Sequence, residues 1–223
     1  MTQSDEEKAR ILWHSAKNVF ASYKHLDALY GAVDENFCEI SFKHDGDNFT
    51  GDQSNCPKDG HFDSDWVNLV WSSHANLRAQ KKKGRPKLVG TVSAHLMLAD
   101  GGDADLAPDW TWRGQPCLIA GWHEEGSRMA SEWDDGGYWT VDWFDPTDED
   151  STGHISAGGK CIWRYKDEMG LDLKTGFFVV PIFDLTSEED LEKHVFKPLI
   201  RLFQGASEDD AFPEDSPAVR TAK

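Results

Sequence analysis

The run Gly176–Phe183 constrains the fold most, because all seven residues after the glycine are apolar and most are β-branched or aromatic. Such a run is much shorter than the roughly 20 apolar residues that a membrane-spanning helix needs. Its composition and length predict a strand that is covered on both faces. We expect the rest of the chain to be organised around this strand.

A helix is predicted directly after this strand, over residues 187–203. Thr186 and Ser187 offer a hydroxyl for the first turn, and carboxylates follow within three residues. Pro198 is expected to kink or shorten the helix, because proline has no amide hydrogen to donate. The apolar positions of this helix follow at helical spacing and are Leu191, Val195, Leu199 and Leu202.

Two more helices are predicted, over residues 5–30 and 64–82. The first begins at a capping pattern, repeats apolar residues at steps of four and three, and is expected to end at Gly31. Its repeat consists of Leu12, Ala16, Val19, Tyr23, Leu26 and Tyr30. The second has an apolar stripe of Trp66, Val70, His74 and Leu77 and is expected to end in the cluster Lys81–Gly84.

Strands are expected where apolar residues alternate with polar ones or cluster in short runs. We predict them over residues 37–44, 88–99, 116–123, 138–144, 160–166 and 177–183. No helical pattern separates the last four, so antiparallel pairing is the simpler connection. The predicted fold class is α+β, with a mainly antiparallel sheet of five to six strands and about three helices packed on it, mostly on one face. Residues 1–205 are expected to form a single domain and 206–223 an acidic disordered tail.

The charge balance narrows the classes of partner. Forty acidic and twenty-three basic residues give a formal net charge of -17. Such a surface repels nucleic acid backbones and anionic membranes and attracts basic proteins. With an acidic amino-terminal segment and no long apolar window, we predict a cytoplasmic protein without a membrane contact. The four cysteines are then expected to be reduced.

Motifs for phosphate or metal binding are incomplete. Gly153–Cys161 has part of the pattern of a phosphate-binding loop, but its spacing is one residue too long and Cys161 stands where a hydroxyl belongs. The start of a hairpin is the better interpretation. Two predicted loops are rich in carboxylates but do not follow the calcium-loop pattern. One holds Asp45, Asp47 and Asp52, and the other holds Asp145, Asp148, Glu149 and Asp150. We predict no cofactor and no metal site, and leave open whether these loops hold a divalent cation.

Tryptophan is the remaining anomaly: seven of the ten tryptophans fall between Trp110 and Trp163. Rings in polar loops surrounded by carboxylates are typical of a protein-binding surface, where the rings supply burial and the charges steer a basic partner. The residues assigned to this surface are Trp110, Trp112, Glu124, Glu125, Trp133, Asp134, Asp135, Asp145 and Asp148.

The leading functional hypothesis is therefore a non-enzymatic acidic interaction module, such as an inhibitor, an immunity-type protein or an adaptor, that binds a basic partner. One alternative is an inhibitor whose acidic surface imitates DNA. Another is a metal-assisted hydrolase that uses His123, beside Glu124 and Glu125, as a general base together with loop carboxylates such as Asp145. The sequence does not determine the oligomeric state.

Overall fold

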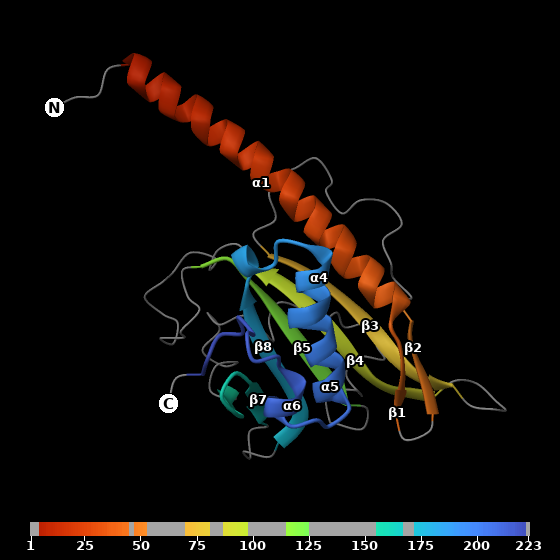
Figure 1. Cartoon of the computed structure of the whole chain (residues 1–223). Helices are drawn as coiled ribbons and strands as arrows, with labels where there is room; N and C mark the ends of the chain where they lie inside the picture. Colours follow the sequence, from red (N-terminus) through yellow and green to blue (C-terminus); the bar gives the residue numbers. More distant parts are fainter. Residues whose placement is uncertain are drawn as a thin grey trace.

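The computed structural model describes residues 5–44, 47–52, 70–80, 87–97, 115–124, 155–166 and 172–221. These residues form one antiparallel sheet with helices on it (Figure 1), which confirms the predicted α+β class. The sheet has eight strands in the order β1-β2-β3-β4-β5-β8-β7-β6, more than predicted. The strands are β1 Ser41–His44, β2 Asp47–Asp52, β3 Val70–Gln80, β4 Lys87–Met97, β5 Cys117–Glu124, β6 Ile155–Ala157, β7 Trp163–Lys166 and β8 Asp172–Pro181.

The strand β8 is buried on both faces, as the apolar run predicts. Phe178 and Val180 belong to the main core, while Phe177 and Val179 are buried on the opposite face. The strand ends at Pro181, and the short 3-10 turn η2 (Ile182–Asp184) follows. Phe183 in this turn is 75 % exposed, so the last part of the apolar run leaves the sheet.

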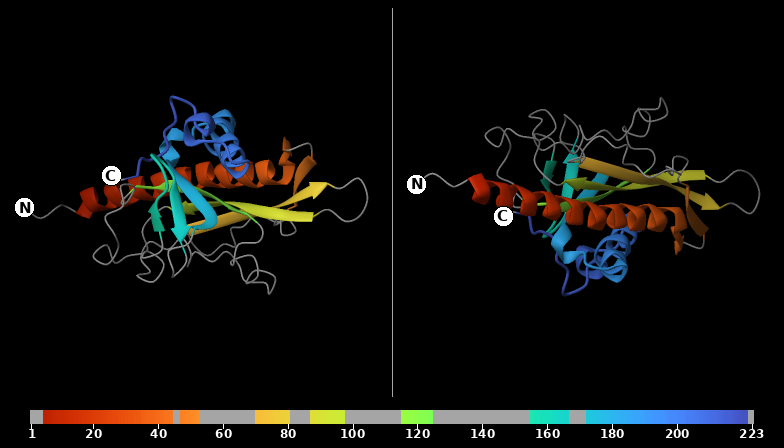
Figure 2. Two further views of the ribbon diagram at one scale, coloured as in Figure 1. Left: turned by 90° about the horizontal axis from the view of Figure 1, so that it is seen from below. Right: turned by 90° about the horizontal axis from the view of Figure 1, so that it is seen from above.

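The helices of the described chain cover one face of the sheet, as predicted (Figure 2). Their buried side chains meet the inward side chains of the strands in a single apolar core. The helices are α1 Asp5–Glu39, α4 Glu188–Leu191, the π-helical η3 Glu192–Phe196, α5 Lys197–Phe203 and α6 Glu208–Ala211.

Helix α1 does not end at Gly31 as predicted but continues to Glu39. The apolar stripe that includes Tyr30 continues through Val33 and Phe37, which are fully buried. The Phe37 ring packs edge-on against Phe196, with 5.1 Å between ring centroids. This burial outweighs the roughly 1 kcal/mol that glycine costs inside a helix. The predicted strand 37–44 is correspondingly reduced to β1.

The predicted helix 64–82 is wrong where the structure describes it, because residues 70–80 form β3. The sequence of this segment fits two patterns. Some of its apolar residues have helical spacing, but Ala75, Leu77 and Ala79 also alternate as in a strand, and all three are buried. β3 pairs with both β2 and β4. Backbone pairing on two sides, which a local pattern does not reveal, decides in favour of the strand.

The loop predicted to hold Asp45, Asp47 and Asp52 also contains a strand, β2, at residues 47–52. Gly51 permits a close approach there, because a β-carbon at this position would lie 2.7 Å from the Phe37 carbonyl oxygen. The Gly51 amide donates to the Ile40 carbonyl at 2.8 Å. These two contacts join the end of α1 to the sheet.

The predicted helix 187–203 is confirmed, with a local change of register. Ser187 caps it by accepting a hydrogen bond from the Asp190 amide at 3.1 Å. The π-helical segment η3 comes immediately before α5, in which Pro198 is an early residue. Since proline has no amide hydrogen, the wider π turn accommodates it without ending the helix.

The carboxyl-terminal residues 206–221 differ from the predicted disordered tail. They contain α6, and Ala211 and Ala218 belong to the main core. The Val219 amide donates to the Val179 carbonyl at 2.8 Å, which ties this segment to β8. The sequence is polar enough to suggest disorder, but Ala211 and Ala218 are buried and Phe212 packs against the core.

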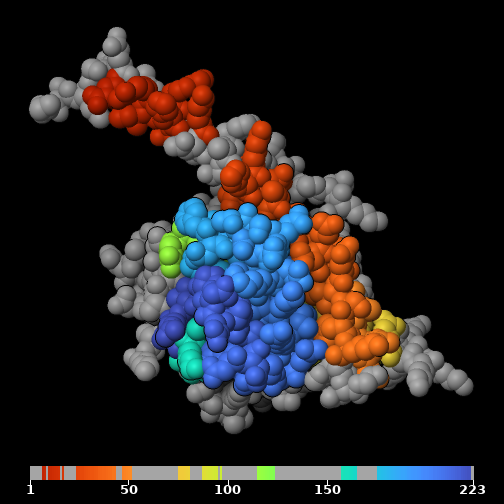
Figure 3. Space-filling model, viewed as in Figure 1, coloured from red at the N-terminus to blue at the C-terminus, as the bar shows by residue number. Residues whose placement is uncertain are grey.

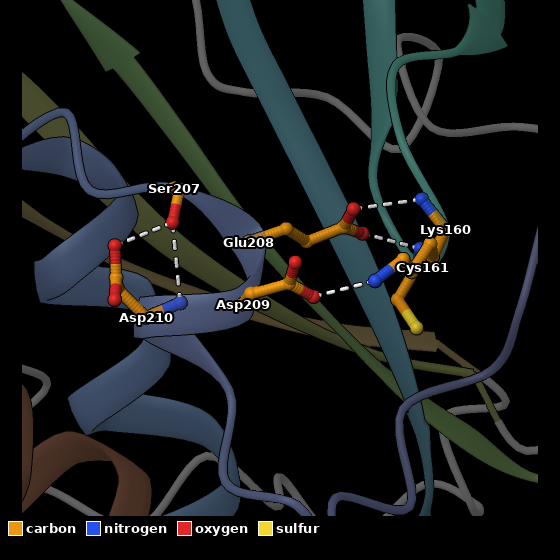
Figure 4. A network of polar contacts seen from close by, with 6 residues as sticks. All are labelled: Lys160, Cys161, Ser207, Glu208, Asp209 and Asp210. Atoms are coloured by element: carbon orange, nitrogen blue, oxygen red, sulfur yellow. Dashed lines mark hydrogen bonds and ion pairs between the residues drawn. The ribbon is translucent and has the colours of Figure 1, made fainter.

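A polar network fixes α6 to the turn between β6 and β7 (Figure 4). The Glu208 carboxylate accepts hydrogen bonds from the backbone amides of Lys160, at 2.7 Å, and Cys161. The Asp209 carboxylate lies 2.5 Å from the Lys160 ammonium group. The described part of the partial phosphate-loop motif thus forms β6 and the turn of a hairpin, as predicted, and the Glu208 carboxylate accepts hydrogen bonds from two amides of that turn.

The cysteines are not all reduced, contrary to the expectation from sequence. Cys38 near the end of α1 is disulfide-bonded. Cys117 and Cys161 carry free thiols, and burial raises the pKa of Cys117 to about 12. The prediction therefore fails for Cys38.

Two glycines in helical surroundings should respond oppositely to substitution by alanine. Gly31 is exposed in α1, and a β-carbon added there would have nothing within 4 Å, so Gly31→Ala should raise the free energy of unfolding by about 0.5–1 kcal/mol. Gly205 has a φ of 83°, a conformation that costs energy for alanine, so Gly205→Ala should lower the free energy of unfolding by about 1 kcal/mol. Urea titration of both variants measures the difference; a destabilising Gly31→Ala would contradict the helix assignment.

Candidate interaction surface

The interaction surface predicted from the sequence lies almost wholly outside the described residues. Only Glu124 is described, at the end of β5, where its backbone pairs with Gly90. The structure therefore does not test this set, and the surface stays a prediction. The residues outside the description are Trp110, Trp112, Glu125, Trp133, Asp134, Asp135, Asp145 and Asp148.

The amino-terminal half of α1 is an exposed apolar feature of the described chain. It projects from the body of the protein (Figures 1 and 3). Every described side chain from Glu7 to His25 is exposed, whereas burial begins around Leu26 and is complete at Tyr30. Ile11, Leu12 and Trp13 are 46 %, 71 % and 63 % exposed. We call residues 8–26 the projecting segment.

The projecting segment continues the stripe that the rest of α1 buries. Leu12 begins the same four-and-three repeat that leads to Tyr30, Val33 and Phe37. A helix that carries such a stripe normally buries it against another element. Lys17 covers part of this surface, since its ammonium nitrogen lies 5.6 Å from the Trp13 ring centroid. Most of the Trp13 side chain remains in contact with solvent.

Charge is segregated along α1, which begins with the three acidic residues Asp5, Glu6 and Glu7. Residues 8–26 contain four lysine or arginine residues and no acidic one, whereas residues 27–39 contain four acidic residues and no lysine or arginine. The projecting segment is therefore positive in a strongly negative protein. The basic residues are Lys8, Arg10, Lys17 and Lys24, and the acidic residues are Asp27, Asp34, Glu35 and Glu39.

An acidic groove of about 340 Å³ lies between the buried half of α1 and the start of the carboxyl-terminal helices. Five glutamates line it, and only Ala32 and Asn36 contribute uncharged side chains. Glu192 is paired with Lys197 at 3.0 Å, and Asn36 donates to the Ala32 carbonyl at 2.8 Å. The five glutamates are Glu35, Glu39, Glu188, Glu189 and Glu192, and we call this feature the acidic groove.

Neither the projecting segment nor the acidic groove is among the sites predicted from sequence. Trp13 does not stand out beside the larger group of tryptophans between residues 110 and 163. The useful signal is the segregation of charge along one helix, combined with an apolar stripe longer than the body can cover. The groove has no sequence signature, since it joins glutamates more than 140 residues apart.

A largely buried polar row crosses the opposite face of the sheet. Asn76, Thr91, His123 and Thr175 are neighbours on four successive strands. The Thr91 hydroxyl donates to the Asn76 side-chain oxygen at 3.0 Å, and His123 Nδ1 lies 2.8 Å from the Thr175 hydroxyl. Ser93, further along β4, is fully buried, and its hydroxyl makes no hydrogen bond within the described structure.

The surroundings of His123 do not favour general-base chemistry. The side chain is 1 % exposed, and burial lowers its pKa from 6.5 to about 4. A general base works best with a pKa near the operating pH, so this imidazole is a weak base at neutral pH. The loop carboxylates expected to assist it, such as Asp145, lie outside the described residues. The hydrolase alternative stays a prediction.

Metal-ligand clusters and membrane-spanning helices are both absent from the described part of the chain. Within the described ranges, no three His, Cys, Asp or Glu side chains are grouped as metal ligands would be. Among the same residues, no helix combines the length and apolar character needed to cross a membrane.

The fold and surface define an α+β protein with one antiparallel sheet and an exposed amphipathic helix. Comparisons with protein-family models, curated proteins and solved structures found no match to this chain.

The low pKa of His123 makes stability depend on pH. The unfolded state binds a proton near pH 6.5 and the folded state only near pH 4, so stability should fall as the pH drops from about 6.5 to about 4. The full effect of this histidine is roughly 3 kcal/mol. Urea titrations of the wild type and His123→Gln at several pH values isolate it, and a difference between the two that does not change with pH would contradict this account.

Proposed function

We propose that this protein is a non-enzymatic protein-interaction module that binds a partner through the projecting segment of α1. The observation that carries the proposal is the exposure of Leu12 and Trp13 on a regular helix that extends beyond the body. A class of interaction protein is what the sequence predicts. The contact surface supported by the described residues is a different one.

The energetics support a partner for this segment. Burying a large apolar side chain contributes about 1.5–3 kcal/mol, so covering Leu12 and Trp13 offers several kcal/mol to a complex. Most of the stability of a protein helix comes from packing of its apolar face, so a partner that covers the stripe would also stabilise this part of α1. An amphipathic helix that lies in a groove is a recurrent mode of protein recognition.

The charge of the projecting segment specifies the partner's chemistry. With Arg10 and Lys17 beside the exposed apolar residues, the complementary surface is an apolar groove with an acidic rim. The basic partner predicted for the region around Trp112 and Asp134 would bind elsewhere on the molecule. That contact and the imitation of DNA stay predictions.

The cytoplasmic location also stays a prediction. A disulfide such as that of Cys38 is more common in oxidising compartments.

A photo-crosslinking amino acid at position 13 tests the proposal in cells that produce the protein. The account expects a specific protein adduct from position 13 and none from position 183, where Phe183 is similarly exposed but lies in η2, outside the projecting segment. Leu12→Glu should abolish the adduct without changing the melting temperature by more than a few degrees, because Leu12 is 71 % exposed. Equal adducts from both positions, or none from position 13, would overturn the proposal.

A further inference from the structure

We propose that the partner presents an acidic amphipathic α-helix, which lies along the projecting segment and packs against its apolar stripe. This inference rests on the proposed function, because it assumes that the projecting segment is a contact surface. It deepens that function by naming the secondary structure and the charge of the surface that α1 meets. The partner's helix forms one wall of the apolar groove, and its carboxylates supply the acidic rim.

The shape of the projecting segment is the first argument. It is part of one regular helix and stands away from the body (Figures 1 and 3), and every described side chain from Glu7 to His25 is exposed. Residues 8–26 extend over about 28 Å at about 1.5 Å per residue. A second helix matches so long and narrow a surface, because two helices that cross at a small angle stay about 8–10 Å apart along their contact.

The spacing of the apolar residues is the second argument. They recur along the sequence of α1 at steps of four and three, so Leu12 and Leu26, two seven-residue repeats apart, hold equivalent positions. Helices that pack at a small crossing angle insert such residues between side chains of the other helix. The buried end of the same stripe already contacts a helix, since Phe37 meets Phe196 of η3 edge-on at 5.1 Å. The exposed end, at Leu12 and Trp13, is suited to a contact of the same kind.

The positions of the basic residues are the third argument. Arg10 and Lys17 are exposed and seven residues apart, and Lys24 follows at the same interval, which is about 10 Å along the helix. The Lys17 ammonium nitrogen lies 5.6 Å from the Trp13 ring centroid, so this row borders the apolar stripe. Carboxylates seven residues apart on a second helix repeat at the same interval, whereas residues on one side of a strand repeat at about 7 Å. An acidic helix therefore stays in step with the row.

The remaining charges show where the contact ends and disfavour a second copy of this chain as the partner. The first turn of α1, Asp5–Glu7, is acidic, and Asp5 stands where the apolar repeat would continue. Carboxylates at a helix start are favoured by the helix dipole, but they repel an acidic partner, so the contact begins after Glu7. A second copy would add its own basic residues to the contact, and each copy carries a net charge of -17.

Mapping of crosslinks from the full chain tests the inference. The photo-crosslinking amino acid is placed at position 13 or at position 20, seven residues further on, in cells that produce the protein. Mass spectrometry then identifies the crosslinked residues of the partner. We expect both positions to reach one continuous α-helical segment of a different protein. The two sites should be about seven residues apart, with Asp or Glu among their neighbours.

Charge variants test the acidic character of that helix. Arg10→Glu with Lys17→Glu should lower the yield of the position-13 adduct at least about tenfold, because two attractions become repulsions. Lys43→Glu with Lys87→Glu reverses two exposed lysines on β1 and β4 and should leave the yield unchanged. The two double variants have the same net charge, so their comparison removes the effect of total charge. Circular dichroism and the melting temperature check that each variant is folded.

Four results would overturn the inference and leave the proposed function standing: sites scattered over several separate segments, sites in β-strands, sites on a second copy of this chain, or equal yields from the two double variants. Absence of any protein adduct at position 13 would refute both. That outcome includes a full chain that binds vesicles of phosphatidylcholine and phosphatidylserine instead, since a basic amphipathic helix can also lie on an anionic membrane.

Discussion

The need to cover one apolar stripe determines much of this structure. The apolar stripe runs the length of α1. In its carboxyl-terminal half, Tyr30, Val33 and Phe37 are buried against the sheet and η3. The body ends before the stripe does. The apolar stripe that anchors α1 is therefore longer than the surface that covers it, and Leu12 stays exposed. The proposed contact through the projecting segment follows from this difference in length.

The sheet shows a second consequence of burial. The central residues of β4, β5 and β8 are buried on both faces, so even the polar side chains of Thr91, His123 and Thr175 are removed from water. Thr91, His123 and Thr175 are satisfied by hydrogen bonds between neighbouring strands, and His123 remains neutral at physiological pH because burial lowers its pKa. A histidine next to carboxylates in sequence suggests catalysis, whereas its position in the sheet favours a structural role.

Short-range patterns predict the fold well where they agree with long-range pairing. The strand at Phe177–Val180 and the helix capped by Ser187 follow from length, composition and capping alone. The residues of β3 are predicted as a helix because Val70, His74 and Leu77 also fit helical spacing, and only pairing with β2 and β4 resolves the ambiguity. The carboxyl-terminal segment is held in part by hydrogen bonds from the Lys160 and Cys161 amides to Glu208, which is 48 and 47 residues away in sequence. Composition cannot reveal such long-range contacts.

The candidate site is less predictable than the fold. The apolar repeat of residues 5–30 predicts a helix correctly, but nothing in it shows where the body stops, and the acidic groove joins glutamates that only the fold brings together. Hydrogen exchange of the α1 amides, with and without the protein captured by crosslinking from position 13, tests the central claim most directly. We predict that protection of residues 8–25 rises when that partner is bound, while that of residues 29–39 is high in both states. Protection of residues 8–25 that the bound partner leaves unchanged would contradict it.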